Sequence, residues 1–226
     1  MPSLFISRED HRIRRLKSRD ERLAQVVDRI GDLFLDDYSD GYRFLVFRII
    51  GQMISDRAAR AICERFEELC GGEVIPSVVA NLPESELLEV GLSRPKSAYV
   101  SGVTELVLTG ELNLNELPSL SDEEVEARLT AVKGVGSWTA QMYLMCALQR
   151  ENVLPENDRV IQTTAAWLYG LDDLNSKELK ERGEIWSPYR SFAAFYLYRA
   201  SEFGFVSVPF VEWAARWNQT VAPDAL

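Results

Sequence analysis

The stretch Leu129–Val160 constrains the fold of this chain more than any other part. It places Gly134 and Gly136 two residues apart between two apolar runs of helical spacing, and Ser137 and Thr139 follow directly. Glycine tolerates the tight turn that such a junction needs, and the backbone N–H groups at the start of the second helix then point outward. Ser137 and Thr139 are candidates to cap that helix. The stretch predicts a helix, a glycine hairpin and a helix, with an anion site at the hairpin.

Hydrophobic residues elsewhere also recur at helical spacing, and no segment has a convincing strand pattern. A Ser18–Glu21 capping box would open a helix that continues through Leu33 and Phe34, and a second box, Ser121–Glu124, would open the helix before the hairpin. Ser187–Pro188 would start a long aromatic helix. We therefore expect an all-α chain.

The chain has 226 residues and a net charge of −10, which is unusual for a protein that binds DNA. The charges are unevenly spread, however, because no Asp or Glu occurs from Thr130 to Gln149 or from Ile185 to Ala200. This distribution suits a hairpin that meets a DNA phosphate. Burial of these two acid-free runs as helices explains each of them equally well.

Several classes of protein are disfavoured by the composition. No apolar run of about 18 residues predicts a membrane span, and the first residues lack the pattern of a secretory signal. The cysteines are odd in number and form no metal-binding cluster; they are Cys63, Cys70 and Cys146. We expect a cytoplasmic, nucleoid-associated protein with reduced thiols, no targeting signal and no membrane partner. The lone histidine, His11, has no assigned role, and the basic cluster around it is expected to be a solvated terminus.

Asp158 lies where the loop after the hairpin region enters another helix. At the N-cap its carboxylate would accept backbone N–H bonds that favour the charged form. Position alone favours an ordinary helix cap over a catalytic group. Aromatic side chains are frequent on both sides of this loop and could stack on an extruded base, especially a cationic one. Core packing is the commoner role for any single aromatic residue.

Five sequence blocks together resemble the helix-hairpin-helix DNA glycosylases of the HhH-GPD superfamily. Within them the chain is similar to the 3-methyladenine glycosylase II type, without that type's N-terminal α+β domain. The blocks are IIGQMISDRAAR (Ile49–Arg60), GLSRPKSAYV (Gly91–Val100), VKGVGSWTA (Val132–Ala140), VLPENDRVIQ (Val153–Gln162) and WSPYRSFAAFYLYR (Trp186–Arg199).

The resemblance implies base excision repair of alkylation damage. The protein would be a hydrolase that flips a damaged nucleotide out of double-stranded DNA and cleaves its N-glycosidic bond. The substrates would be alkylated purines of the 3-methyladenine and 7-methylguanine type. Asp158 falls on the family's catalytic aspartate. Gln52 and Met53 correspond to residues that fill the gap in the base stack, with Met53 as an intercalating wedge.

The resemblance also assigns further residues. The hairpin residues that would bind a DNA phosphate are Lys133, Gly134, Val135, Gly136, Ser137 and Thr139. The base pocket would contain Trp138, Met142 and Tyr198, where Met142 departs from the family's aromatic residues. Candidates for further contacts with the DNA backbone are Ser55, Arg94, Lys96 and Arg190.

Trp138 stands where bifunctional members of the family carry a lysine that forms a Schiff base. We therefore expect a monofunctional enzyme that leaves an abasic site uncut. The lack of a four-cysteine cluster argues against the iron–sulfur branch of the family. We expect no metal and no cofactor, although backbone carbonyls of the hairpin could hold a monovalent cation.

The expected architecture has two helical lobes with the active cleft between them. Residues 1–41 would pack with the C-terminal lobe, residues 42–140 would form a middle bundle that ends in the hairpin, and residues 141–226 would form the C-terminal lobe with the catalytic aspartate. We expect a monomer. The alternatives are a glycosylase for deaminated or oxidised bases, a non-catalytic helix-hairpin-helix DNA-binding protein, and an acidic helical scaffold with no role at DNA.

Overall fold

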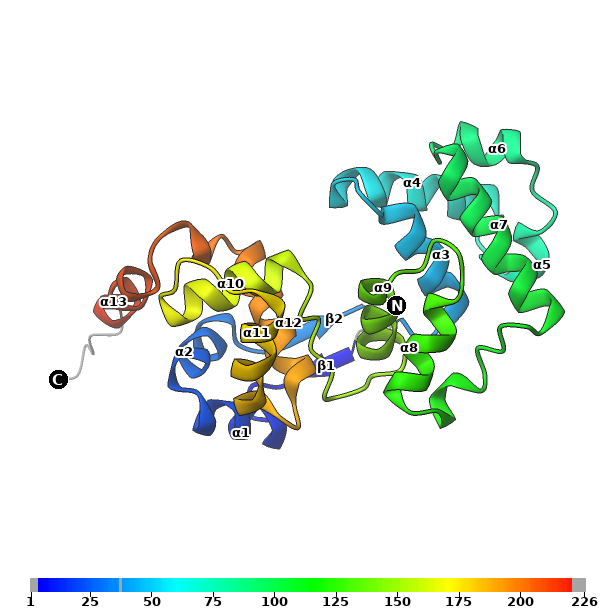
Figure 1. Ribbon diagram of the computed structural model, residues 1–226. Helices are drawn as coiled ribbons and strands as arrows, with labels where there is room; N and C mark the ends of the chain where they lie inside the picture. Colours follow the sequence, from blue (N-terminus) through cyan, green and yellow to red (C-terminus); the bar gives the residue numbers. More distant parts are fainter. Residues whose placement is uncertain (1–3, 37, 221–226) are drawn as a thin grey trace. The chain divides into compact units, whose positions relative to one another are not determined.

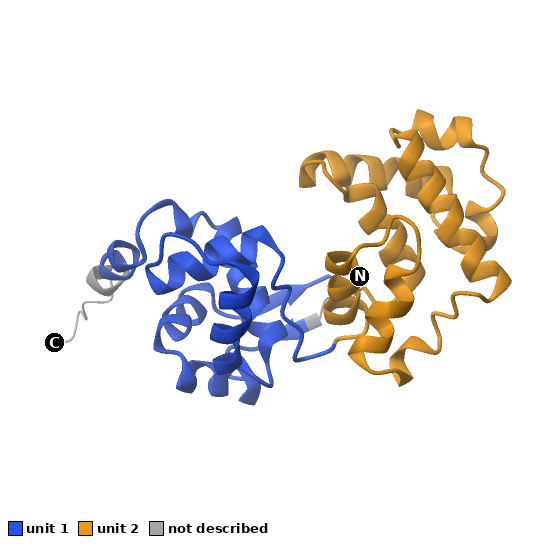
Figure 2. Ribbon diagram, in the orientation of Figure 1, with its two compact units in different colours: residues 1–36, 150–226 blue, residues 37–149 orange. Residues whose placement is uncertain are grey.

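The chain folds into two compact units (Figures 1 and 2). The computed structural model describes residues 4–36 and 38–220. Unit 1 combines residues 1–36 with residues 150–226, and unit 2 is the continuous segment 37–149. The boundaries therefore differ from those expected at residues 42 and 141. The difference arises because the helix that follows the hairpin continues to Ala147 and packs on its neighbours in unit 2.

The described residues of unit 2 form helices and no strands. In chain order they are α3 (Gly41–Gly51), α4 (Asp56–Leu69), α5 (Pro76–Val79), α6 (Glu84–Glu89), α7 (Arg94–Thr109), η1 (Leu117–Ser119), α8 (Asp122–Thr130), α9 (Ser137–Met142) and the π-helical η2 (Tyr143–Ala147). Helix α3 forms the centre because it is apolar around most of its circumference and packs against α4, α7 and η2.

Unit 1 joins both ends of the chain. Its elements are β1 (Leu4–Ile6), α1 (His11–Arg19), α2 (Glu21–Ile30), β2 (Leu33–Leu35), α10 (Arg159–Tyr169), α11 (Ser176–Gly183), η3 (Glu184–Trp186), α12 (Arg190–Glu202), η4 (Phe205–Ser207) and α13 (Phe210–Thr220). Helix α12 is buried along most of its length and packs against α1, α2 and α10. The C-terminal helices thus complete their core with the N-terminal ones.

A small antiparallel sheet corrects the expectation of a chain without strands. Strand β2 pairs with β1, and Phe34 lies opposite Phe5. Leu33 and Phe34 were expected to extend the preceding helix, but Gly31, with φ of +80°, ends α2 at Ile30. The partner strand lies far away in the sequence, so helical periodicity alone could not reveal the pairing.

Two expected helix starts are also wrong. Asp20, not Ser18, caps α2 by accepting N–H bonds from its first turn, whereas the Ser18 hydroxyl donates to the Arg15 carbonyl. Ser187–Pro188 precedes α12 with a cis peptide bond, and the helix begins only at Arg190. At α2 tertiary contacts decide the start, because Asp20 is buried and also accepts bonds from two distant aromatic side chains.

Other sequence predictions are confirmed. The Ser121–Glu124 capping box forms at the start of α8. Asp158 caps α10 as expected, and this helix ends at Gly170. Among the described residues, no helix has the length and apolar content needed to cross a membrane.

Candidate active site

The hairpin between α8 and α9 needs glycine at its first position. Gly134 has φ of +93°, and a Cβ atom there would lie 2.4 Å from Cγ of Tyr99 on α7. Gly136 differs, since its φ is −94° and a Cβ atom would meet nothing within 4 Å. The first glycine therefore lets the turn sit against the Tyr99 ring. The second leaves open space in front of the backbone at the start of α9, where another molecule can approach closely.

The expected caps of α9 are wrong. Gly136 occupies the N-cap position, and no side chain accepts a hydrogen bond from the first-turn amides. The Ser137 hydroxyl bonds instead to the carboxylate of Glu126 on α8, and Thr139 is buried. Without a side-chain cap, the amides of this first turn are available to an acceptor outside the chain.

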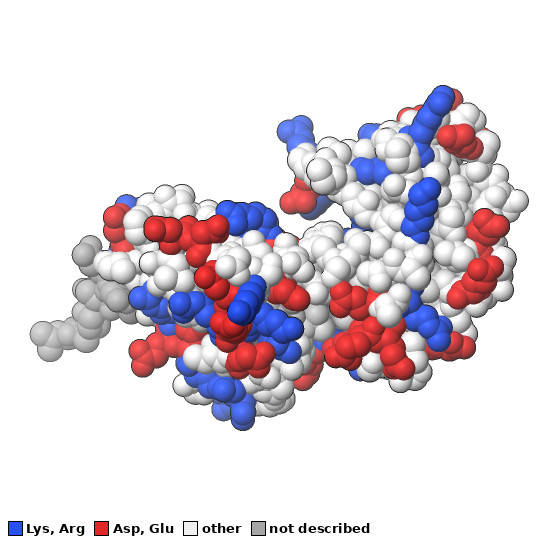
Figure 3. All heavy atoms as spheres, in the orientation of Figure 1, with Lys and Arg blue, Asp and Glu red and all other residues white. Residues whose placement is uncertain are grey.

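Glu126 qualifies the sequence argument about charge. The hairpin segment itself contains no acid, but the fold brings this carboxylate to Ser137 from the preceding helix. Acidic side chains also gather around α8 on the face shown in Figure 3, where Asp122, Glu123 and Glu124 form its first turn. The carboxylates of α8 thus lower the local positive potential next to the hairpin.

The segment that carries Gln52 and Met53 is joined to the hairpin. Gln52 ends α3, and its Nε2 donates a 2.8 Å hydrogen bond to the carbonyl oxygen of Gly134. Met53 follows with φ of +57°, and its side chain is 100% exposed. A left-handed conformation at a residue other than glycine costs roughly 1–3 kcal/mol. The backbone therefore adopts an unfavourable conformation at a methionine that none of the described residues covers.

Four residues were candidates for contacts with the DNA backbone, and the structure separates them. Ser55 is exposed and caps α4, since its Oγ accepts from the Ala58 N–H at 3.3 Å. Arg94 is exposed in the first turn of α7, and Lys133 in the hairpin is exposed as well. Two of the four candidates, Ser55 and Arg94, and the hairpin residue Lys133 thus lie on the surface of unit 2.

The side chains of Lys96 and Arg190 instead form hydrogen bonds within the protein. The Lys96 ammonium donates to the Ile50 carbonyl at 2.8 Å, close to the end of α3, and burial lowers the pKa of this lysine. Arg190 donates from Nε to the backbone and side-chain oxygens of Asn152 and from Nη1 to Glu184. Each side chain therefore positions a segment next to a predicted site residue.

Asp158 is the N-cap of α10 and is only 8% exposed. Its Oδ1 accepts N–H bonds from Val160 at 2.7 Å and Ile161 at 3.2 Å. Its Oδ2 accepts a 2.8 Å hydrogen bond from the Tyr198 hydroxyl. These hydrogen bonds hold both carboxylate oxygens at the positive end of the helix dipole. The result is a fixed negative charge on a rigid helix end.

The loop before Asp158 is held by a serine that sequence reasoning missed. The Oγ of buried Ser191 donates to the Arg150 carbonyl at 2.6 Å and accepts from the Val153 N–H at 3.0 Å. Ser191 follows Arg190 in the Trp186–Arg199 block, and this block was the available signal. Tyr99, which lies below the hairpin, gave no signal beyond its place in the Gly91–Val100 block.

The predicted pocket residues fall in both units. Tyr198 lies in unit 1 and contacts Asp158 directly. Trp138 and Met142 lie on α9 in unit 2, where Trp138 is half-buried and Met142 is 7% exposed. The structure therefore brings Tyr198 to the carboxylate, and it brings Gln52 to the hairpin.

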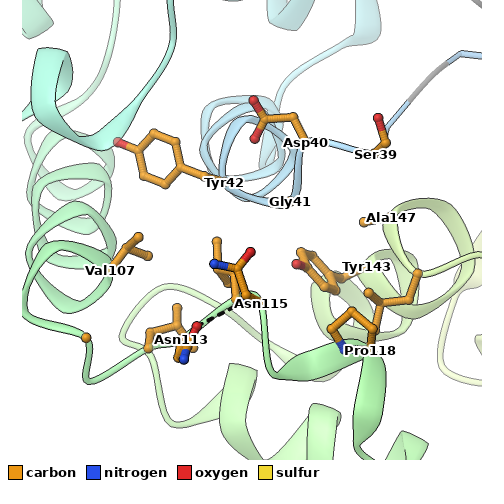
Figure 4. Close-up of a pocket in the computed structure, with 14 residues that line it drawn as sticks. Ser39, Asp40, Gly41, Tyr42, Val107, Asn113, Asn115, Pro118, Tyr143 and Ala147 are labelled. Carbon is orange, nitrogen blue, oxygen red and sulfur yellow. Dashed lines mark hydrogen bonds between the residues drawn. The ribbon is translucent and has the colours of Figure 1, made fainter.

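A depression in unit 2 lies at the other end of α3. It encloses about 660 Å³ beside the first turn of that helix, where Asp40, Tyr42 and Tyr143 are part of its wall (Figure 4). None of the predicted site residues lines it. Among the described residues, no group of three or more His, Cys, Asp or Glu side chains could hold a metal ion.

Comparison with known proteins identifies the family. The profile described as HhH-GPD superfamily base excision DNA repair protein matches residues 46–188. The chain belongs to this superfamily. The matched segment includes both the glycine hairpin and Asp158, and the two-lobed helical fold is that of the superfamily.

Individual members of the superfamily are similar over most of the chain. DNA-3-methyladenine glycosidase from Bacillus halodurans is 34% identical, with a TM-score of 0.76 over 87% of this chain and 92% of that one. The 3-methyladenine DNA glycosylase Mag1 of Schizosaccharomyces pombe, solved in complex with abasic DNA, is 27% identical, with a TM-score of 0.77 over 83% of this chain and 95% of that one. The YfjP protein of Bacillus subtilis is 31% identical over 174 residues, which span 74% of this chain and 60% of YfjP.

Proposed function

We propose that this protein is a monofunctional DNA glycosylase of base excision repair. It hydrolyses the N-glycosidic bond of flipped-out alkylated purines of the 3-methyladenine and 7-methylguanine type and leaves an abasic site. The observation that carries the proposal is the carboxylate of Asp158, which hydrogen bonds hold at the start of α10. Similar proteins are named DNA-3-methyladenine glycosidase and 3-methyladenine DNA glycosylase, which supports the assignment.

The hairpin binds the DNA backbone in this proposal. The uncapped amides at the start of α9 donate to a phosphate oxygen, and the open space at Gly136 lets the phosphate approach. Lys133, Arg94 and Ser55 supply further contacts from the surface of unit 2. Backbone donors read no sequence, so this binding positions the enzyme on any duplex.

Met53 provides the wedge that replaces the extruded base. Its fully exposed apolar side chain inserts between neighbouring base pairs and partly offsets the unstacking cost of a few kcal/mol. Gln52 anchors the backbone next to Met53 through its hydrogen bond to the Gly134 carbonyl. Backbone contact and intercalation are thereby coupled, because the same hydrogen bond joins the two segments.

Asp158 stabilises the sugar during bond cleavage. The bond between C1′ and the purine nitrogen breaks with its electron pair going to the base, and positive charge develops on the sugar ring. The fixed carboxylate stabilises that charge electrostatically. Water then adds at C1′ and loses a proton. A purine alkylated at N3 or N7 already carries a positive charge, so it leaves as a neutral molecule and needs no strong general acid.

Trp138 leaves the hairpin without the lysine that lyase chemistry requires, so strand cleavage does not follow base release. Trp138, Met142 and Tyr198 contribute to the pocket for the flipped base. The protein acts as a monomer on duplex DNA in the cytoplasm and uses no cofactor, apart from a monovalent cation that hairpin carbonyls could hold.

The Asp158→Asn variant tests the proposal. Asparagine caps helices as well as aspartate does, so the fold should be preserved. We expect base release from a duplex with one 7-methylguanine to fall roughly 100-fold or more, while affinity for an abasic-site analogue changes little. Strand breaks should require added alkali.

Asp40→Asn is the matched control, because Asp40 caps α3 in the same way. That variant should release bases at the wild-type rate. Normal excision by Asp158→Asn would refute the catalytic assignment. Failure of the wild-type protein to release any methylated base would refute the glycosylase itself and favour a non-catalytic DNA-binding protein.

A further inference from the structure

We propose that Tyr198 is a positioning residue for Asp158, whose hydroxyl fixes the carboxylate instead of reading the flipped base. This inference rests on the proposed glycosylase function. It starts from the 2.8 Å hydrogen bond that the Tyr198 hydroxyl donates to Oδ2 of Asp158. The sequence placed Tyr198 in the base pocket, but its polar atom is directed to the catalytic carboxylate.

The hydrogen bond completes the restraint of the carboxylate. Oδ1 is already fixed by the amides of Val160 and Ile161, which belong to the same helix as the residue they bind. Tyr198 donates from a different helix, and it acts on the other oxygen. A carboxylate held at both oxygens cannot rotate about its last side-chain bond without breaking a hydrogen bond. Its charge therefore keeps one direction.

The position of the hydroxyl is itself well defined. Tyr198 follows three buried residues of α12, Phe195, Tyr196 and Leu197, and α12 packs along α10. The next residue, Arg199, donates to the Phe34 carbonyl at 2.9 Å and to Glu202 at 2.7 Å. The ring thus extends from a helix turn that is anchored on both sides, as a supporting residue for a catalytic group requires.

The contact also shapes the chemistry and the substrate class. Because hydrogen bonds hold both oxygens, the carboxylate presents its charge to the sugar in one direction. Asp158 then acts as a fixed charge that stabilises the sugar cation. Such a site favours purines whose own positive charge drives their departure. Neutral lesions such as deaminated purines should be released more slowly.

Tyr198→Phe tests this role, since it removes only the hydroxyl and keeps the ring that could contact a base. We expect single-turnover release of 7-methylguanine to slow by about tenfold, with affinity for abasic-site DNA within about twofold of wild type. Tyr196→Phe is the matched control. Tyr196 lies two residues earlier in α12 and donates to the Gly31 carbonyl at 3.0 Å, away from Asp158. Its removal should lower thermal stability and leave the rate unchanged.

The possible outcomes separate the two proposals. A Tyr198→Phe rate within twofold of wild type would overturn the positioning role and leave the glycosylase standing. A loss of abasic-site affinity as large as the loss of rate would overturn it too, because Tyr198 would then bind DNA directly. Absence of base release by wild type would sink the glycosylase itself. Independently of activity, nuclear magnetic resonance should find the Tyr198 hydroxyl proton in slow exchange with water, and rapid exchange contradicts the contact.

Discussion

Replacement of Gly134 by alanine should destabilise unit 2 through two separate effects. The first is backbone strain, because φ at this position is +93°. The second is steric, since the new Cβ would lie 2.4, 2.6 and 2.8 Å from three atoms of Tyr99. These three atoms include the start of the side chain and of its ring, so a small rotation of the ring does not relieve the contact.

The expected size follows from these two effects. A residue with a side chain in the left-handed region costs about 1–2 kcal/mol, and overpacking at a site that must shift costs typically about 1–3 kcal/mol. Their sum is roughly 2–5 kcal/mol of unfolding free energy. For a chain of this size, each kcal/mol lowers the melting temperature by about 2–4 °C. A loss of at least about 4 °C is therefore expected.

Thermal melting followed by circular dichroism measures the loss, and Gly136→Ala is the control. At Gly136 the backbone conformation suits any residue and the Cβ position is empty, so only the preference of the N-cap for glycine over alanine is lost, and stability should change by less than about 1 kcal/mol. Affinity for duplex DNA should nevertheless fall, because the methyl group occupies the approach of a phosphate. In the double variant Gly134→Ala/Tyr99→Ala, the clash with the Tyr99 ring is removed and the backbone strain remains. Only the steric contribution to the loss of unfolding free energy should therefore be recovered. A Gly134→Ala protein as stable as wild type would refute this reasoning.

Three further predictions concern other parts of the chain. Met53→Ala should change the unfolding free energy by less than about 0.5 kcal/mol and weaken binding of abasic-site DNA severalfold in fluorescence anisotropy. The control is Ile75→Ala, a change at another exposed apolar side chain, which should leave this binding unchanged. A Met53→Ala affinity equal to that of wild type would argue against the wedge. Asp20→Ala removes a buried acceptor of four hydrogen bonds and should lower the free energy of unfolding, measured with urea, by about 3 kcal/mol. The control Asp10→Ala removes the partly exposed cap of α1 and should lower it clearly less. Burial raises the pKa of the thiols of Cys63, Cys70 and Cys146 to about 11, so little thiolate exists at pH 8. Iodoacetamide should therefore label the native protein far more slowly than the unfolded one. Equal labelling rates would contradict the burial of these thiols.

Features that depend on neighbouring residues could be read from the sequence. The hydrophobic spacing gave the helical class, and glycine at positions 134 and 136 gave the hairpin, because both effects act within a few residues. Asp158 was predictable as a helix cap for the same reason. Its proposed catalytic role rests on resemblance to a family, since a capping aspartate has the same local pattern whether or not it performs chemistry.

Contacts between distant segments required the tertiary structure. The strand at Leu33–Leu35 depends on a partner near the N-terminus, and the cap at Asp20 is buried by residues about 150 positions away. The hydroxyl of Tyr198 turned out to serve Asp158, and Lys96 to serve the end of α3. A side chain's type sets which bonds it can make, but packing decides which partner it meets.

The sequence by itself therefore determined the helical class, the glycine hairpin and the position of the carboxylate at a helix start. Each of these follows from steric limits and hydrogen bonds within one or two turns of chain. The tertiary structure decided what surrounds them. It provided the Tyr99 ring under Gly134, the Gln52 bond that ties the wedge to the hairpin, and the donor that fixes Oδ2 of Asp158. These contacts join residues from 35 to 82 positions apart, and their pairing is fixed only when the helices pack.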